Sequence, residues 1–240
     1  MVDRRTLLAG ISATGVVALA GCTDILEDEI EAEAAQTAIN EDTLDETGYE
    51  YVDSEAYVVD DTVDAAGIER EVDVTSWIST YAKDVEGLEL DDETELTAEE
   101  VAEVENQVED ALGQDGAGFV VVSTPDEEIM GVDLNPIARY DDEELIEEFN
   151  DDIVDGEVTG VEETGEHSAV LLGDDVTASE YVVTVQTGDG DEFEANVFVA
   201  ETTNEDDIVL AAGAQPTGYG EDEQFLSLIE AIEHPADGQE

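Results

Sequence analysis

Charge constrains this chain more than any other feature, because 69 acidic side chains stand against five basic ones in 240 residues. The formal net charge of −64 opposes compaction in dilute buffer, since like charges repel one another across a folded surface. At molar salt the Debye length falls to about 3 Å, so this repulsion largely disappears. The acids are spread along the whole chain and only one lysine is present. The composition therefore predicts a fold adapted to the multimolar salt in which a halophile lives.

The same composition bears on order and on partners. A high net charge with low hydrophobicity is the signature of disorder, but 41% of the residues are hydrophobic and long stretches have strand or helix periodicity. A folded main body is therefore expected in high salt. Nucleic acid is excluded as a partner, because neutralising phosphates requires a basic surface. Weakly bound cations are expected at the acidic patches instead.

The first 22 residues have the pattern of an export signal with a lipidation site. Arg4 and Arg5 resemble a twin-arginine signal and precede an uncharged, mostly apolar run over residues 7–20. That run is too short to span about 30 Å of hydrocarbon but suits the apolar region of a signal peptide. The sequence LAGC that ends at Cys22 resembles a lipobox. Residues 1–21 are therefore expected to be removed and Cys22 to be lipidated.

Cys22 is the single cysteine of the chain, which excludes an internal disulfide and a cysteine-based zinc site. One acyl chain anchors a protein only marginally, and the resemblance to archaeal lipoproteins implies a two-chain lipid. The expected location is the outer face of the cytoplasmic membrane, reached through the twin-arginine export machinery. The alternative is an uncleaved N-terminal membrane segment.

The mature chain is predicted to be a single α+β domain over residues 45–234, with an acidic tether at 22–44 and a disordered tail at 235–240. We expect a twisted, mainly antiparallel sheet of seven to nine strands with two or three helices packed on it. The antiparallel pairing follows from the short connections, because parallel crossovers need about a dozen residues or more.

Individual elements follow from periodicity and from turn signals. The run FVVVSTP at 119–125 is typical of a central strand that is buried on both faces. Residues 97–112 begin with a capping box and end at a glycine, which indicates an inserted helix. The other predicted strands are 49–63 and 68–84 as a hairpin, 129–134, and four or five strands across 157–215. The other predicted helices are 33–46, 141–154 and 222–233.

Short motifs in a fixed order carry a family resemblance. They are Gly48-Tyr49-Glu50, Val74-Thr75-Ser76-Trp77 with Tyr81 and Lys83, Val121-Val122-Ser123-Thr124-Pro125, and Asn135-Pro136. In this order they resemble a family of haloarchaeal twin-arginine lipoproteins of unknown function, over residues 45–235 except for the helix at 97–112. From residue 141 onward, the order of elements is more faintly similar to PsbP-like domains. That similarity implies an α/β/α sandwich with binding or scaffolding duties rather than catalysis.

Residues with catalytic potential are few. His167 is expected in a polar turn or at a strand start, and His234 in a fraying C-terminus. Ser123 is expected in a buried strand without the Gly-x-Ser-x-Gly elbow of hydrolases. No nucleotide-binding motif is present, so no cofactor is predicted. The acids at 189–194 match a calcium loop only in part, because a phenylalanine interrupts them and the glycine is missing. Neither a catalytic group nor a metal site is predicted.

Basic residues are rare enough to be informative. Lys83 ends a predicted strand on which alternation places Trp77, Tyr81 and Lys83 on one face. With Arg139 as a second cation, this face is a candidate site for an anionic or sugar-like ligand. The alternative, which we favour, is that a helix covers the face and the bases form ion pairs.

The sequence thus leads to one expected function and one alternative. The expected function is a non-enzymatic, membrane-anchored binding or interaction module of unknown ligand. The alternative is a cell-envelope hydrolase that uses carboxylates as acid and base.

Overall fold

The computed structural model describes residues 29–65, 68–84, 87–88, 115–126, 128–129, 132–133, 145–146, 157–186, 192–204 and 206–236. Most of these residues lie in strands of one main sheet, and two helices have defined bounds. The fold is therefore mainly β rather than the balanced α+β fold that was predicted. The predicted helix 97–112 and most of 141–154 lie outside the described residues. No helix in the described ranges is long and apolar enough to cross a membrane.

Eight strands form the main sheet, which confirms the expected size. They are β1 (Glu29–Glu33), β3 (Glu50–Ala65), β4 (Ile68–Asp84), β5 (Asp115–Pro125), β8 (Glu157–Leu171), β9 (Asp174–Gln186), β10 (Glu192–Asn204) and β11 (Asp207–Pro216). Their order is β1-β4-β5-β11-β10-β9-β8, and β3 pairs with β4. The pairing is antiparallel throughout except between β1 and β4, which run parallel.

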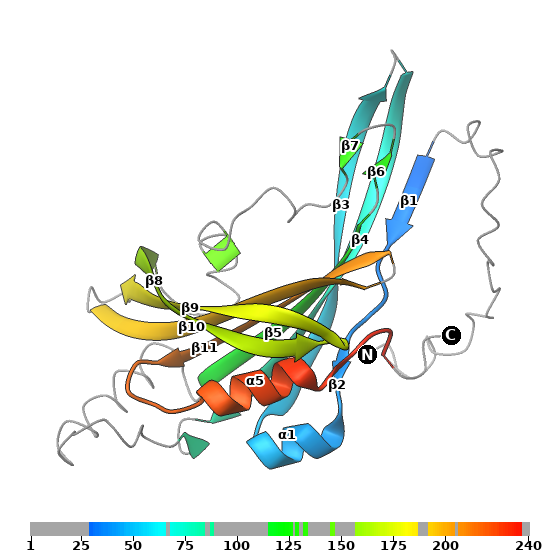
Figure 1. Ribbon diagram of the computed structural model, residues 1–240. Coiled ribbons are helices and arrows are strands. Elements are labelled where there is room, and N and C mark those ends of the chain that lie inside the picture. The colour runs from blue at the N-terminus through cyan, green and yellow to red at the C-terminus, as the bar shows by residue number, and fades with distance from the viewer. Residues whose placement is uncertain are drawn as a thin grey trace, which may run out of the picture.

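The predicted hairpin is the longest feature of the sheet. β3 pairs with β4 from Ala65↔Ile68 to Glu50↔Ala82, and β4 alone is 17 residues long. The other side of β4 is shared, because β1 pairs with residues 71–75 and β5 pairs with residues 77–84. In Figure 1 the hairpin therefore extends beyond the rest of the sheet, with β1 beside it.

Two helices lie at the end of the molecule opposite the hairpin tip (Figure 1): α1 (Glu41–Thr47) and α5 (Asp222–Glu230). Asn40 caps α1 by accepting a hydrogen bond from the Thr43 N–H at 2.9 Å, and Gly48 ends it at a φ of +78°. The predicted helix 33–46 is therefore only partly correct. Its first part instead leads through β2 (Ala38–Ile39).

Both termini of the domain are more ordered than predicted. Residues 29–33 of the expected tether form β1, because the apolar residues of EIEAEA alternate and Ala32 and Ala34 are buried. The C-terminal helix ends at Glu230 rather than 233, and the chain continues as β12 (Ile232–Glu233), which pairs with β2. In the expected tail, the Ala236 N–H donates to the carbonyl of Gln36 at 2.8 Å.

The region predicted as one strand at 129–134 contains two short ones, β6 (Glu128–Ile129) and β7 (Val132–Asp133), which pair with each other. The region 157–215 forms four antiparallel strands, as expected.

The sheet is packed on both faces. On one face, Phe225 of α5 contacts Phe119 and Phe198, with ring centroids at 6.1 and 5.4 Å. Gly213 permits this approach, because a Cβ there would lie 2.5 Å from the Phe225 ring. On the other face, Leu145 and Ile146 pack against β5, β10 and β11. Residues 119–125 are all buried, which confirms the prediction of a central strand.

Candidate interaction surface

The face predicted from Trp77, Tyr81 and Lys83 exists but is covered. Tyr81 is 2% exposed and Lys83 is 8% exposed, whereas Trp77 is half-buried. The Ile39 N–H of β2 donates to the Tyr81 hydroxyl at 3.1 Å. Arg139 lies outside the described residues. Because β2 and the start of α5 cover Tyr81 and Lys83, these two side chains do not form an open recognition surface.

Lys83 belongs to a buried ion pair that ties β4 to α5. Its Nζ donates to both carboxylate oxygens of Glu221, at 3.0 and 2.8 Å, and the Glu221 side chain is fully buried. The Glu221 N–H in turn donates to the side-chain oxygen of Gln215. Lys83 Nζ also lies 5.8 Å from the centre of the Tyr49 ring. The alternative that assigned this lysine to an ion pair is confirmed.

Two tyrosines beside this pair have altered acidity. Burial raises the pKa of Tyr81 to about 12, although the hydrogen bond from Ile39 lowers it and the nearby Tyr51 raises it. Burial, and secondarily the negative charge of Glu221, also raises the pKa of Tyr49. Both phenols are therefore neutral hydrogen-bonding or packing groups at physiological pH. Neither is suited to act as a base.

A second buried polar cluster surrounds His234, whose side chain is 2% exposed. His234 Nε2 lies 2.9 Å from Asp207 Oδ2 and 3.3 Å from Ser123 Oγ, and Nδ1 lies 3.2 Å from Asn204 Oδ1. In a Ser-His-Asp triad the carboxylate and the nucleophile contact different imidazole nitrogens. Here they share one, so the cluster does not form that relay.

The His234 cluster instead seats both ends of the domain. Asp207 Oδ2 also accepts a hydrogen bond from the Ala35 N–H at 2.8 Å, so one carboxylate contacts the N-terminal segment and the C-terminal segment. The prediction of a fraying His234 is wrong, because its side chain is buried and contacts Asp207, Asn204 and Ser123. The sequence could not show this, because these partners lie far from His234 along the chain. His167 is a satisfied, partly exposed histidine, as predicted, since it pairs with Glu180 at 2.8 Å. It lies within β8, however, and not in a turn or at a strand start as expected.

Polar concavities do not define a ligand site. A groove of about 490 Å³ lies between α1 and α5, and its ionisable lining residues are Glu46, Glu223 and Glu230. Those acids match the acidic surface of the whole chain. Within the described ranges, no group of three histidine, cysteine or acidic side chains is placed to hold a metal ion.

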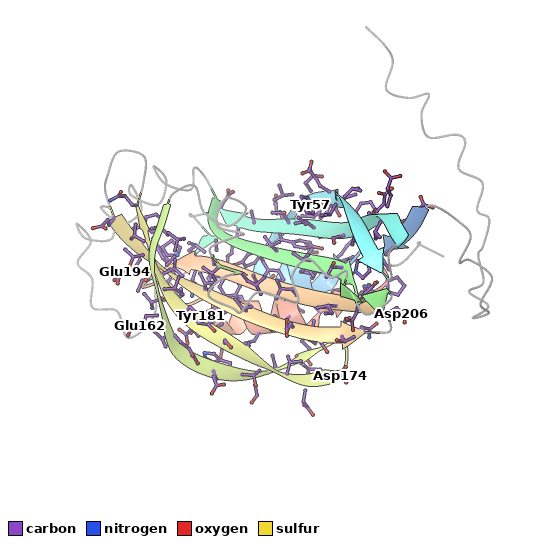
Figure 2. The ribbon with its side chains drawn as sticks, turned by 90° about the horizontal axis from the view of Figure 1, so that it is seen from above. Tyr57, Glu162, Asp174, Tyr181, Glu194 and Asp206 are labelled. Atoms are coloured by element: carbon purple, nitrogen blue, oxygen red, sulfur yellow. The ribbon has the colours of Figure 1, made fainter. Side chains whose placement is uncertain are left out.

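Exposed hydrophobic residues are concentrated on one strand. Among the described residues, the large hydrophobic side chains that are exposed are Tyr51 (55%), Val52 (55%), Tyr57 (56%) and Val58 (52%). All four belong to β3, which pairs only with β4 among the described strands. We call this strand with its unpaired outer side the β3 edge. Figure 2 shows Tyr57 at one margin of the sheet, with Glu162 and Asp174 at the other.

A strand of this kind is a common docking element in proteins. Its outward N–H and C=O groups can pair with an added strand, while exposed side chains provide specificity. The only irregularity in the β3–β4 pairing is a bulge at Val52, between Tyr51↔Tyr81 and Asp53↔Thr80. From Asp53 to Ala65 the edge runs without interruption.

A family model covers most of the chain. It matches residues 36–233 and is described as "Domain of unknown function (DUF6517)". The chain belongs to this family. No curated protein matches the chain.

The matched segment begins beside β2 and ends with β12, and Ile39 and Ile232 of these strands are paired. The first and last strands of the matched segment therefore pair with each other. The segment includes β3, whereas β1 precedes it in the sequence.

The β3 edge was not predicted from the sequence. Turn signals predicted the hairpin, but a hairpin does not show which of its strands receives a further neighbour. That depends on β1 and β5, which both pair with the same side of β4.

Proposed function

We propose that this protein is a non-enzymatic interaction module of a halophile, anchored through a lipid on Cys22 to the outer face of the cytoplasmic membrane. In this proposal it binds a protein partner by strand addition at the β3 edge. The observation that carries the proposal is the concentration of exposed tyrosine and valine side chains on β3, whose outer side has no partner among the described strands. Exposed hydrophobic groups gathered in one place mark interaction sites in soluble domains.

The N-terminal sequence supports the anchoring. Arg4 and Arg5 precede an apolar run and the LAGC sequence, as an exported lipoprotein precursor requires. Only six residues lie between Cys22 and Glu29, where β1 begins. That segment can span about 25 Å at most, so the lipid would keep the domain close to the membrane.

The buried carboxylates favour binding over hydrolysis. Among the described residues, Glu221 and Asp207 are the acids classed as buried, and Lys83 and His234 respectively contact them. A carboxylate hydrolase needs two acids that flank a substrate cleft. Glu221 and Asp207 serve the packing of the domain instead.

The proposal is tested with the native lipoprotein, extracted and affinity-purified in molar KCl. Wild type is compared with the double variant Tyr57→Glu, Val58→Glu, and with Ser168→Glu, which adds an acid to the exposed surface of β8 at the other margin. We expect the double variant to lose bound protein that wild type and Ser168→Glu retain. Equal recovery with all three proteins would refute binding at the β3 edge.

Anchoring is tested separately with Cys22→Ser. This variant should accumulate as precursor or leave the membrane fraction. Normal processing and membrane retention would refute the lipid anchor while leaving the β3 edge untouched.

A further inference from the structure

We infer that the partner bound at the β3 edge is a second copy of this chain, paired through antiparallel β3 strands about a two-fold axis at Ala56. The inference rests on the proposed function, because it names the partner for that same surface. Homodimers with two-fold symmetry are the commonest oligomers, and their interfaces must be self-complementary. The sequence of β3 can therefore be tested for self-complementarity.

Symmetry limits the registers that are open to two β3 strands. In an antiparallel pair related by a two-fold axis, the residue on the axis faces its own copy, and residues at equal distances on either side face each other. Facing side chains lie on the same face of the joined sheet. The bulge at Val52 ends regular β3 geometry on one side, so pairing is considered from Asp53 onward.

Facing charges and the position of Val58 together favour one register. With Ala56 on the axis, Asp53 faces Val59 of the second copy, Ser54 faces Val58, and Glu55 faces Tyr57. An axis at Ser54 would place Asp53 against Glu55, an axis at Glu55 would place that residue against itself, and an axis at Tyr57 would place Asp53 against Asp61. Like charges that face each other directly destabilise a strand pair. Of the axes from Ser54 to Val58, only Ala56 avoids such a pair. An axis at Val59 also avoids it but sets Val58 against Asp60, whereas the Ala56 register sets Val58 against Ser54.

The Ala56 register also covers two of the four exposed hydrophobic side chains. Tyr57 and Val58, each more than half exposed in the single chain, come to lie against the partner strand. Ala56 is paired with the half-buried Trp77 on β4. Both alanines are small, so one tryptophan from each copy can flank the axis on the same face of the joined sheet. The joined sheet then runs from β4 through both β3 strands to the second β4.

Salt permits the association. Two chains of net charge −64 repel each other strongly in dilute buffer. At molar salt the Debye length of about 3 Å is shorter than the spacing of about 4.8 Å between paired strands. The repulsion that remains acts between side chains that touch across the two β3 strands. In the Ala56 register no two acids face each other there.

The test uses the full mature chain with Cys22→Ser, so that an added cysteine is the sole thiol. Light scattering after size exclusion in molar KCl should give the dimer mass for this chain and for Ser168→Glu. The double variant Tyr57→Glu, Val58→Glu should give the monomer mass. Circular dichroism of each variant in the same buffer shows whether it is folded.

Cysteine cross-linking then tests the register. Residues that face each other across antiparallel strands have Cα atoms about 4.5–5.5 Å apart, within reach of a disulfide. Ala56→Cys should therefore cross-link rapidly on mild oxidation. Val58→Cys is equally accessible on the same face, but the two thiols would lie about 13 Å apart along the strands and should stay reduced.

A wild-type chain that is monomeric in molar KCl, or a dimer that survives the two glutamates, would overturn the inference. Equal cross-linking of Ala56→Cys and Val58→Cys would overturn the register. If the wild type is monomeric but the two glutamates still abolish recovery of another protein, the proposed function stands and only the second copy is ruled out.

Discussion

The two long margins of the main sheet, β3 and β8, differ in how regular and how hydrophobic their outer sides are. β8 pairs only with β9 among the described strands, and this pairing is interrupted at Val158/Gly160 and again at Glu163/Gly165. Bulges of this kind twist an edge away from regular pairing. β3 has a single bulge and then a long regular run, along which Tyr57 and Val58 are exposed.

The two edges also differ in how they meet the core. β8 ends at Leu171, which is fully buried in the cluster that contains α5. The exposed residues of β8 are polar or glycine, among them Glu162, Glu163 and Glu166. One margin is therefore closed by bulges and charge and is tied to the core. The other has a regular outer side without a partner among the described strands, and its geometry depends on how β4 is fixed.

The largest expected effect concerns the attachment of the β3–β4 hairpin. Lys83→Ala leaves Glu221 buried without its partner, which should lower the free energy of unfolding by about 3–5 kcal/mol. Urea unfolding in molar KCl, followed by circular dichroism, measures the loss. Replacing both residues with apolar ones, Lys83→Met with Glu221→Leu, should restore much of it. A loss below about 1 kcal/mol for the single variant would mean that the pair behaves as an exposed one and does not fix the hairpin.

The second prediction compares the two edges directly. Leu171→Ala on β8 creates a cavity beneath α5 and should cost about 2–5 kcal/mol of unfolding free energy. Val58→Ala on β3, made in a Tyr57→Glu background, should change it by no more than about 0.5 kcal/mol. Urea unfolding of both variants gives the comparison. Similar costs at the two positions would remove the distinction between a packed and an available edge.

The individual strands and helices of this contrast could be predicted from the sequence, but the pairing that makes β3 an edge could not. Local signals predicted the hairpin, the buried strand around Val121 and the helix α5, because turns and periodicity are properties of neighbouring residues. β1 was hidden among acids, and its pairing with β4 joins residues about 40 positions apart. Lys83 and Glu221 are 138 positions apart, and Ser123 and His234 are 111 positions apart. Local sequence patterns cannot indicate such contacts. Which strand becomes an edge follows from such long-range choices.

The third prediction concerns alkaline pH. The pKa of Tyr81 is about 12 in the folded chain, against an ordinary value of 10.0. Below pH 10 both states hold the proton, so this contribution to stability is complete; as pH rises from 10 towards 12 the unfolded chain loses the proton first and stability falls. Tyr81→Phe should make the alkaline loss shallower in urea titrations. Tyr57→Phe, on the exposed β3 edge, should leave it unchanged, and an equal effect of both would contradict the difference in burial.

The smallest expected effect is spectroscopic. Trp77 is the single tryptophan, is half-buried, and is paired with Ala56. Acrylamide, a neutral quencher, should therefore reduce its fluorescence in part, and more so in the double variant Tyr57→Glu, Val58→Glu than in the wild type. An anionic quencher is unsuitable because the acidic surface repels it. Identical quenching of the two proteins would argue against a partner strand beside Ala56.

The parallel pairing of β1 with β4 has a mechanical consequence. Under the proposed anchoring, any pull between the membrane and the domain enters the fold at Glu29 and acts along β1 towards the hairpin tip, while the body of the domain holds β4 from the opposite end. The register from Glu29↔Glu71 to Glu33↔Thr75, extended by the Ala34 N–H to the Thr75 carbonyl at 3.0 Å, is then loaded in shear. Its hydrogen bonds must yield together rather than one after another, so a five-residue strand can resist detachment better than its length suggests.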